Sequence, residues 1–488
     1  MDITIGRPQF IALICFVAAS VSCQASTHAN PQLVVSASGT PAKGVEERQR
    51  GTAYKAVAFY YRANLLYTDT SRHVNPSKID WLFDRINESP NDLPIDDVRE
   101  FLNKIESSQL LANLEIAASC SDIEWPWIHE SAERKFLMHA FHEFSNLRTL
   151  GSVVDLNARL NLANQDFDSA VQHMQVHLAM AGHLIGHPDF FHSDQGIVIA
   201  ENALKTIEEF IQQPDSPNLY WFLSLSLREF TNSRLIPSIK ARRKFFDSLF
   251  PSIRDWESQD LDVQDTGQRF RKFVDSLGQE NSNVLSIDTT VVAELSADSR
   301  KNLIQTGLSE EFVSGMSELQ AVVLDRIFQI RMRIDHLESL LKIEFDDAET
   351  NVLVTKVAND LHSLEVSMDM VLTGGYLTND MNEIPNFAKR FSRYMAVKQR
   401  MEMLRLIESV RFHAKLRDGK IPESLQKLDK LNVPLDPATM RPFVYSVDRN
   451  TVQISSDTDG SLNKQTHQEL GYSISLRDSK KGTGNDRR

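Results

Sequence analysis

Apolar side chains recur every three or four positions along most of this 488-residue chain, beginning near residue 46. The first clear series is Ala56, Phe59, Tyr60, Ala63, Leu66 and Tyr67. This spacing places the apolar side chains on one face of an α-helix, where another element has to cover them. The sequence therefore predicts a mainly α fold of packed helices, and the length allows several domains or one elongated array.

Residues 153–186 form the clearest predicted helical hairpin. A polar turn at 164–166 separates two apolar helices, and Asp166 is a suitable N-cap for the second. Three residues match the small, aromatic and small packing positions of a tetratricopeptide-like unit: Ala158, Phe167 and Ala170. We expect a helical-hairpin domain over 46–250 that is tetratricopeptide-like in part.

The remainder of the chain divides into three predicted parts and a tail. Residues 251–308 mix short helices with polar turns and predict an irregular connecting region. Residues 309–418 carry long helical stripes, which favour a bundle of long antiparallel helices. Alternating apolar residues around Asp448-Arg449-Asn450 predict a β-hairpin inside a small α+β cap over 419–476. Residues 477–488 are charged and predict a disordered tail.

The first residues have the pattern of a secretory signal peptide. Arg7 precedes a short apolar run over 10–21, which small residues follow. Two processing routes stay open, namely cleavage after Ala25 and lipidation of Cys23, since Ser20-Val21-Ser22-Cys23 is similar to a bacterial lipobox. We expect a signal peptide over 1–25, a flexible spacer over 26–45 and a periplasmic or envelope location. The membrane would be reached only through a lipid anchor or an uncleaved leader.

The net charge and the cysteine content bear on nucleic-acid binding and on disulfide bonds. The formal net charge is −13, and an acidic surface repels the phosphate backbone, so we expect no nucleic-acid binding. Cys120 is the one cysteine outside the leader, so no internal disulfide is expected. We expect a buried, inert thiol there.

Histidines supply the one candidate metal site. Five lie close together in the sequence: His173, His177, His183, His187 and His192. His173 and His177 are four residues apart, so they share a helix face and could chelate a metal. A third ligand would have to come from His183, Asp189 or Asp194. The chain has no H-E-x-x-H motif, no glycine-rich phosphate loop and no G-x-S-x-G motif, so no cofactor and no catalytic residue are predicted.

Tryptophans near helix breaks are a further candidate feature. Trp125, Trp127 and Trp221 could line a ligand pocket between helices, they could contact a partner, or they could clamp helix ends into the core.

Several segments together resemble a known family. They are AVAFYYRANLLY (56–67), ASCSDIEWPW (118–127), LNARLNLANQDFDSAVQHM (156–174), IQQPDSPNLYWFLSLSL (211–227) and GKIPESL with PLDPATMRPFVYS (419–446). Their order resembles a family of exported proteins from planctomycete-type bacteria that has no assigned activity. The resemblance implies export and a mostly helical fold, and it implies no catalytic residue.

The C-terminal piece is also similar to the tail of type II secretion pseudopilins. The shared residues are Gly419, Pro422, Leu425, Pro434 and Asp436-Pro437. A pseudopilin begins with a long apolar helix, which this chain lacks, so the similarity implies a reused structural cap with a rigid proline turn.

These patterns favour a non-catalytic envelope scaffold or adaptor whose helical surface binds another envelope protein. Two alternatives stay open: a metal-dependent envelope hydrolase that uses the histidines of 173–192, and a small-molecule binding protein. Whether the chain is an enzyme is not decided by the sequence.

Overall fold

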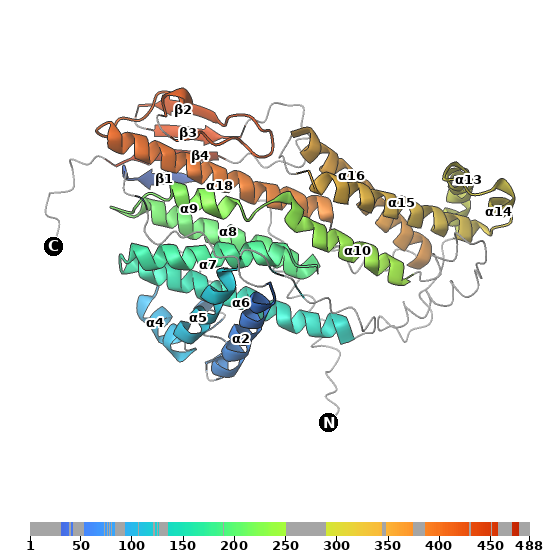
Figure 1. The fold of residues 1–488 in the computed structure, drawn as a ribbon, viewed down its shortest axis with the longest axis horizontal. Helices are drawn as coiled ribbons and strands as arrows, with labels where there is room; N and C mark the ends of the chain where they lie inside the picture. Colours follow the sequence, from blue (N-terminus) through green and yellow to red (C-terminus); the bar gives the residue numbers. More distant parts are fainter. Residues whose placement is uncertain are drawn as a thin grey trace.

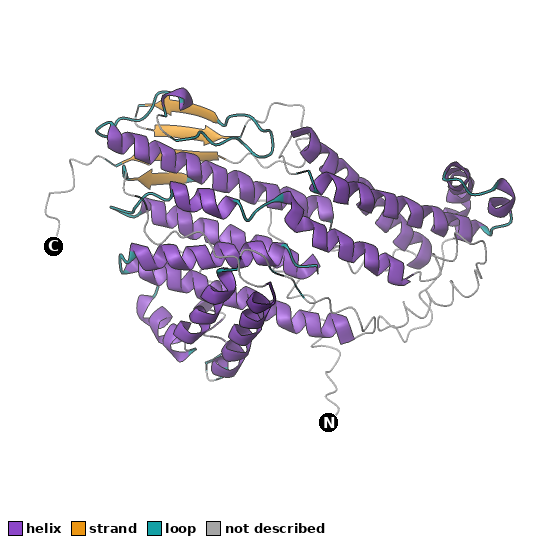
Figure 2. Ribbon diagram, viewed as in Figure 1, coloured by secondary structure: helices purple, strands orange, loops and turns teal. Residues whose placement is uncertain are grey.

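The structure is a computed structural model of the chain. It describes residues 31–38, 53–72, 93–105, 107–120, 135–188, 190–249, 289–343, 348–373, 386–428, 431–449, 451–456 and 471–477, with some single positions between 41 and 125. Most of these residues are helical, and a small four-stranded sheet lies at one end of the helical body (Figure 2). The predicted fold class is confirmed: the chain is mainly α, with a small sheet that contains a β-hairpin.

The first helices pack as successive hairpins. They are α2 (Ala53–Ser71), α4 (Ile95–Lys104), α5 (Ser107–Ala118), α6 (Lys135–Ala163), α7 (Phe167–Ile185) and α8 (Phe190–Gln212). The predicted hairpin is the α6–α7 pair, where Gln165 takes a left-handed φ of 60° and the Asp166 side chain accepts a hydrogen bond from the Ser169 N–H at 3.2 Å. This capping contact starts α7 directly after the turn.

The second half of the chain adds shorter and longer helices. They are α9 (Tyr220–Leu227), η2 (Asn232–Leu235), α10 (Ile236–Leu249), α13 (Thr289–Gln305), α14 (Glu310–Ser314), α15 (Glu318–Leu341), α16 (Ala348–Thr373), α18 (Phe387–Leu416) and η3 (Leu425–Lys427). Helix α18 is the longest of the described helices, and it runs between the sheet and helices α8 and α9 (Figure 1). It packs against α8, α9, α16 and β4, so it joins parts that are far apart in the sequence.

The sheet has the strand order β1-β4-β3-β2. Its strands are β1 (Gln32–Val35), β2 (Val444–Asp448), β3 (Thr451–Ser455) and β4 (Gly471–Leu476). The β2–β3 pair is the hairpin predicted around residue 449, with Asp448 opposite Thr451. Strand β4 pairs antiparallel with β3 and parallel with β1.

Strand β1 corrects the predicted spacer over 26–45. Leu33 and Val35 are buried, and Gln32 pairs with Ser473 from the other end of the chain. Four residues are too few to show a strand period, and their partner is distant, so composition alone suggested a linker. The first described residues therefore belong to the folded body.

A buried cluster, which we call the Arg411 clasp, holds the strand in place. The Arg411 guanidinium donates to the Ser36 carbonyl oxygen at 2.8 Å, to Ser216 Oγ at 2.8 Å and to Glu408 Oε1 at 2.6 Å. Glu408 also accepts from the Leu219 N–H at 3.1 Å. The clasp thus links the segment after β1, the α8–α9 connection and α18.

Two further predicted boundaries differ from the structure. The long helical stripes expected over 309–418 are interrupted after α14, because Ser317 caps a new helix by accepting from the Gln320 N–H at 3.2 Å. The region expected to be irregular over 251–308 contains α13, which packs on α15. Because α18 packs on α8 and α9 as well as on α16, residues 309–418 do not form a separate bundle.

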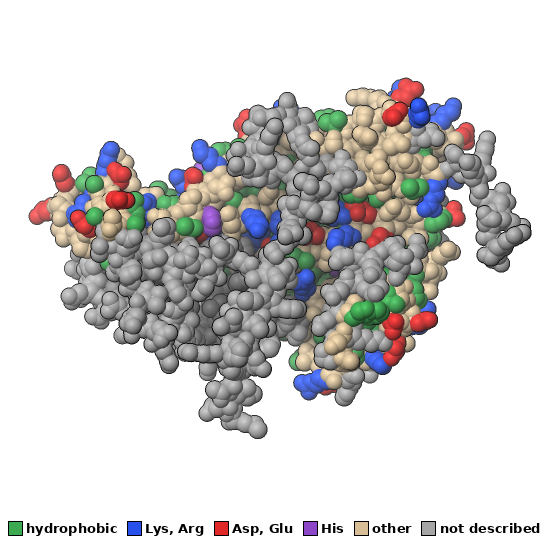
Figure 3. All heavy atoms as spheres, turned by 180° about the vertical axis from the view of Figure 1, so that it is seen from behind, with side chains coloured by type: hydrophobic (Ala, Val, Ile, Leu, Met, Phe, Trp, Pro, Cys, Tyr) green, Lys and Arg blue, Asp and Glu red, His purple; other side chains and the backbone are tan. Residues whose placement is uncertain are grey.

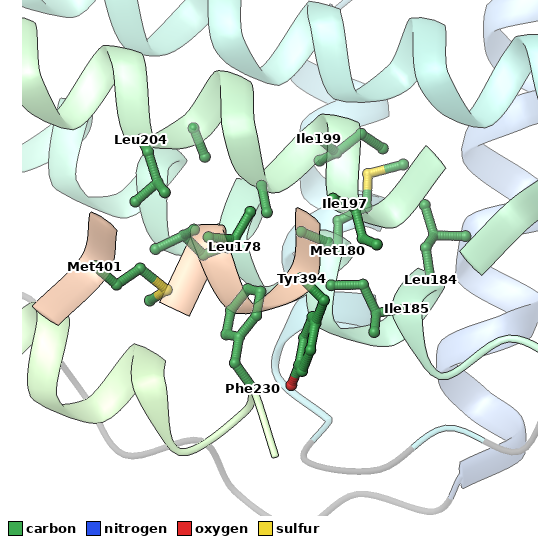
Figure 4. Close-up of a cluster of buried hydrophobic side chains, with 14 of the residues drawn as sticks. Leu178, Met180, Leu184, Ile185, Ile197, Ile199, Leu204, Phe230, Tyr394 and Met401 are labelled. Carbon is green, nitrogen blue, oxygen red and sulfur yellow. The ribbon is translucent and has the colours of Figure 1, made fainter. Parts of the chain in front are cut away.

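The main core lies where α7, α8 and α18 meet. Buried side chains from all three helices interdigitate there (Figure 4). Gly196 of α8 lies against α7 so closely that an added Cβ would be 2.5 Å from the Ile185 nitrogen and 2.8 Å from the Ala181 oxygen. Only glycine permits this approach.

The proline turn of the cap is seated on α18. Asp436 is fully buried, and its carboxylate accepts from the Ala438 N–H at 2.8 Å and from Gln399 Nε2 at 2.9 Å. The Asn351 side chain of α16 donates to the Pro437 carbonyl oxygen at 2.9 Å. The cap is therefore fixed to two helices.

The basic segment around residues 234–244 is largely occupied by ion pairs. Arg242 bonds to Glu365 of α16, Arg243 bonds to Asp335 of α15, and Lys240 lies 3.5 Å from Glu338. These contacts attach α10 to α15 and α16.

On the face seen in Figure 3, basic and acidic side chains are interspersed. Within the described residues, no helix combines the length and apolar character needed to span a bilayer.

Candidate functional site

The two histidines predicted as metal ligands lie on α7 in different surroundings. The side chains of His173 and Asn161 are hydrogen-bonded, with 2.9 Å between Nδ1 and Nδ2, and burial lowers the pKa of His173 to about 4. His177 is buried, with Nδ1 3.7 Å from Asp155 Oδ1, and burial lowers its pKa. Both imidazoles are therefore neutral at ordinary pH, and metal binding by them stays a prediction.

The other candidate ligands are engaged elsewhere. His183 is buried between Tyr60, whose hydroxyl is 2.7 Å from Nδ1, and the Cys120 carbonyl oxygen, 2.9 Å from Nε2. Asp194 binds Arg393 of α18 at 3.0 Å. No group of three or more His, Cys, Asp or Glu side chains placed to hold a metal occurs among the described residues; Asp189 and Cys23 lie outside them.

An aromatic cluster surrounds His183. Trp125 is 7% exposed, stacks on Tyr60 with ring centroids 5.9 Å apart, and donates from Nε1 to the His183 carbonyl oxygen at 3.0 Å. The His187 ring lies 4.6 Å from that of Trp125 and 4.1 Å from that of His192. This cluster clamps the α7–α8 corner to α2, in line with the core role considered for Trp125.

A buried charge network links α6, α7 and α8. Arg159 is fully buried, with Asp155 Oδ2 at 3.0 Å from Nε and Glu209 Oε1 at 3.0 Å from a terminal nitrogen. Thr206 donates its hydroxyl proton to Asp155. Two carboxylates thus share one guanidinium, and Asp155 has the additional hydroxyl donor.

This network has two carboxyl groups for one guanidinium, which favours a bound proton on Glu209. Burial raises the pKa of Glu209 to about 8, and the nearby Asp155 adds to the shift while Arg159 opposes it. A carboxyl group that titrates near neutral pH can donate or accept a proton. Its side chain is 17% exposed, so the proton can exchange with solvent.

We expect Glu209→Gln to flatten the dependence of stability on pH. The folded state holds a proton on Glu209 between pH 4.5 and about 8, and the unfolded state does not. The free energy of unfolding therefore falls by about 1.4 kcal/mol for each pH unit in that window. Stability from this group is complete below pH 4.5 and is lost as the pH rises through about 8.

Urea unfolding of both proteins between pH 5 and pH 9 tests this prediction. The exposed Asp168→Asn on α7 is the matched control for removal of one negative charge. An unchanged slope in Glu209→Gln would show that Arg159 keeps the carboxylate ionised.

A second set of charges joins α8 to α18 and the sheet. Arg400 donates from Nε to Glu208 Oε1 at 2.6 Å and lies 3.0 Å from the Tyr472 hydroxyl, which itself donates to Glu208. Arg393 binds Asp194 and Glu201. These pairs fasten α18 along α8.

A different kind of surface lies at the start of α9. Trp221 is 57% exposed, and its ring packs edge-on against Tyr220 with centroids 5.1 Å apart. The Arg405 guanidinium lies 5.8 Å from the Tyr220 ring centre, and the Tyr220 hydroxyl donates to the Asn432 carbonyl oxygen at 3.1 Å. We call Tyr220, Trp221 and Arg405 the α9 aromatic patch.

The predicted tryptophan set does not act as one group. Trp125 is buried beside α2 and α7, Trp221 is exposed on α9, and Trp127 lies outside the described residues. A partner contact through Trp221 stays a prediction. Arg405 carried no local signal, because its place beside Tyr220 depends on how α18 crosses α9.

Comparisons of the chain with known protein families, with curated proteins and with solved structures find no match. The geometry described above is therefore the basis for the functional proposal.

Proposed function

We propose that this chain is a non-catalytic exported envelope protein, a scaffold or adaptor that offers a helical surface to another envelope protein. The observation that carries the proposal is the α9 aromatic patch. Trp221 exposes 57% of its surface next to Tyr220 and Arg405. A few residues supply most of the binding energy in a protein interface, and tryptophan, tyrosine and arginine are enriched among them.

The charged groups support the same proposal. Arg159, Arg400 and Arg411 are each held by side chains or carbonyl groups from more than one element. Their role in joining the elements accounts for their burial without a catalytic task. The hydrolase alternative would use the histidines of 173–192, and the described residues hold no group of three ligands there.

The patch has the form that a binding anchor needs. Tyr220 is buried and fixed by its hydrogen bond to Asn432. The Trp221 indole therefore packs edge-on against a ring that is itself held in place. Side chains held in this way lose little conformational entropy when a partner covers them. An exposed tryptophan on a rigid helix start is therefore suited to specific binding.

Affinity capture from native envelope extract tests the proposal. The protein of residues 26–488 should retain one partner in near-equal amount, and Trp221→Ala should weaken that binding about 30-fold, equivalent to about 2 kcal/mol at a binding hot spot. Leu65→Ala is the matched control, since Leu65 is 70% exposed on α2. Equal retention by Trp221→Ala, or a blank from the unmodified protein, would contradict the proposal.

A further inference from the structure

One buried histidine of α7 joins three other segments of the chain. The His183 ring is fully buried, with Nε2 2.9 Å from the Cys120 carbonyl oxygen, just after α5, and Nδ1 2.7 Å from the Tyr60 hydroxyl of α2. The His183 carbonyl oxygen accepts a hydrogen bond from Trp125 Nε1 at 3.0 Å. We call Tyr60, Cys120, Trp125 and His183 the His183 latch, because they attach α2 and the end of α5 to α7.

The contacts of the His183 ring fix the position of its proton. A backbone carbonyl oxygen only accepts hydrogen bonds, so Nε2 carries the hydrogen and donates it to Cys120. The Tyr60 hydroxyl then donates to Nδ1. Both nitrogens of the neutral ring are used in this way, and neither is left for a metal or for a carboxylate. A second proton would sit on Nδ1, where the ring now receives the hydrogen of Tyr60.

Charged groups of the neighbouring elements bind each other. A Cβ added at Gly182, next to His183, would lie 3.4 Å from the Cβ of Glu229, which follows α9. The Glu229 carboxylate binds Arg234 of η2 at 2.9 Å. On α8, Asp194 binds Arg393 of α18 at 3.0 Å. These carboxylates are therefore already paired with arginines.

Two other titratable rings lie at the same corner of the fold. The His187 ring is 4.6 Å from that of Trp125 and 4.1 Å from that of His192. A positive charge on either imidazole would repel a charge on the other and would not favour one on His183. The acidic residues Asp122, Glu124 and Asp189 lie outside the described residues.

Taking up a second proton therefore requires His183 to reach water. A histidine that is buried in its neutral form has to be exposed before it can be charged. Because Tyr60 and Cys120 cover the two nitrogens of the ring, exposure requires α2 and α5 to move away from α7. These two helices pack on each other as well as on α6 and α7 (Figure 1), so they can move as a pair.

We propose that His183 is an acid-sensitive latch, and that protonation of its ring releases the α2–α5 pair from α7 while α7, α8 and α18 stay packed. A histidine side chain in water titrates near pH 6.5. The closed form is therefore fully favoured above this pH and is lost as the pH falls below it. Because one proton is bound on opening, the equilibrium constant for opening should rise about tenfold for each pH unit below about 6.5.

Labelling of Cys120 measures this opening, since its thiol is buried beside the latch. The full chain would carry Cys15→Ser and Cys23→Ser, so that Cys120 is its only thiol. The rate of reaction with a soluble disulfide reagent, divided by the rate for the same chain unfolded in urea at the same pH, gives the opening constant. It should rise about 100-fold between pH 7.5 and pH 4.5, while far-UV circular dichroism keeps the signal of folded helices.

His183→Gln removes the titration and keeps the contacts of the ring. The glutamine amide can donate to the Cys120 carbonyl oxygen and accept from the Tyr60 hydroxyl. The opening constant of this variant should lack the 100-fold rise, which is about the factor that one proton contributes over this pH range. His336→Gln, at an exposed position of α15, is the matched control and should keep the full rise.

Tyr60→Phe is a second variant that leaves His183 in place. It removes one hydrogen bond to the neutral ring, so the opening constant should be about fivefold higher at pH 7.5. Its tenfold rise for each pH unit below about 6.5 should remain, because the same histidine titrates.

Three results would overturn the proposal. The first is an opening constant that rises as steeply in His183→Gln as in His336→Gln. The second is labelling of Cys120 that increases only when the helical signal of the whole chain is lost, because the event would then be global unfolding. The third is an unchanged opening constant in Tyr60→Phe, which does not depend on the folding of His183→Gln.

Discussion

Replacing Arg411 by methionine should lower the free energy of unfolding by about 3–5 kcal/mol, since removing one member of a buried ion pair leaves the other charge uncompensated. Arg411 and Glu408 are both fully buried. The substitution also leaves the carbonyl oxygens of Ser36 and Ser216 without the donor that Arg411 provides. Strand β1 should detach before the rest of the molecule unfolds, because the clasp supplies the side-chain hydrogen bond that joins the segment after β1 to α18.

Urea unfolding and amide hydrogen exchange measure these effects. Arg417→Met, an exposed position on the same helix end, is the matched control and should change stability by less than about 0.5 kcal/mol. Adding Glu408→Gln to Arg411→Met should restore part of the loss, because it removes the unpaired buried charge. A stability loss in Arg411→Met no greater than that in Arg417→Met would show that the clasp does not hold the fold.

Replacing Gly196 by alanine should cost about 3 kcal/mol, at the upper end of overpacking in a well-packed core. The added Cβ would meet the backbone of α7 at 2.5 Å, and backbone atoms cannot move aside as a flexible side chain does. Helices α7 and α8 would have to separate, which would disturb the core around Leu178 and Tyr394 (Figure 4).

Gly182→Ala is the control for this substitution. Gly182 is also a buried helical glycine, but the nearest atom to its added Cβ is the Glu229 Cβ at 3.4 Å. Alanine there should be neutral or stabilising by up to about 1 kcal/mol, because alanine favours the helix over glycine. Thermal unfolding of both variants gives the comparison, and equal melting temperatures would contradict the close approach of α7 and α8.

The fold features that the sequence predicts are local ones. The α6–α7 hairpin follows from a helical period and a polar turn within about thirty residues, and Asp166 caps α7 as expected. The β2–β3 hairpin follows in the same way from alternation around Arg449. In both cases the residues that pair are neighbours in the chain.

Features that depend on distant partners could not be predicted. Strand β1 is four residues long, and its first pairing joins Gln32 to Ser473. The separation into a hairpin domain and a bundle fails for the same reason, because α18 carries apolar residues on several faces and contacts both. Apolar residues on several faces of a helix predict that the helix is buried, but they do not identify the elements that pack against it.

The candidate sites show the same limit. The four-residue spacing of Asp155 and Arg159 within an apolar stretch was a usable signal for a buried ion pair, but Glu209 joins them only through the packing of α6 on α8. Trp125 and Trp221 both lie near helix breaks, and nothing local distinguishes the buried ring from the exposed one. Their exposure is decided by which helix covers each break.

The claim that the α9 aromatic patch binds an envelope protein is tested most directly by photocrosslinking in living cells. A photoreactive amino acid would replace Trp221 in one strain and Leu65 in another, both being well exposed positions of the described surface. The account predicts one dominant crosslinked protein from position 221 and none of that mass from position 65. The same product from both positions, or no product from position 221, would contradict it.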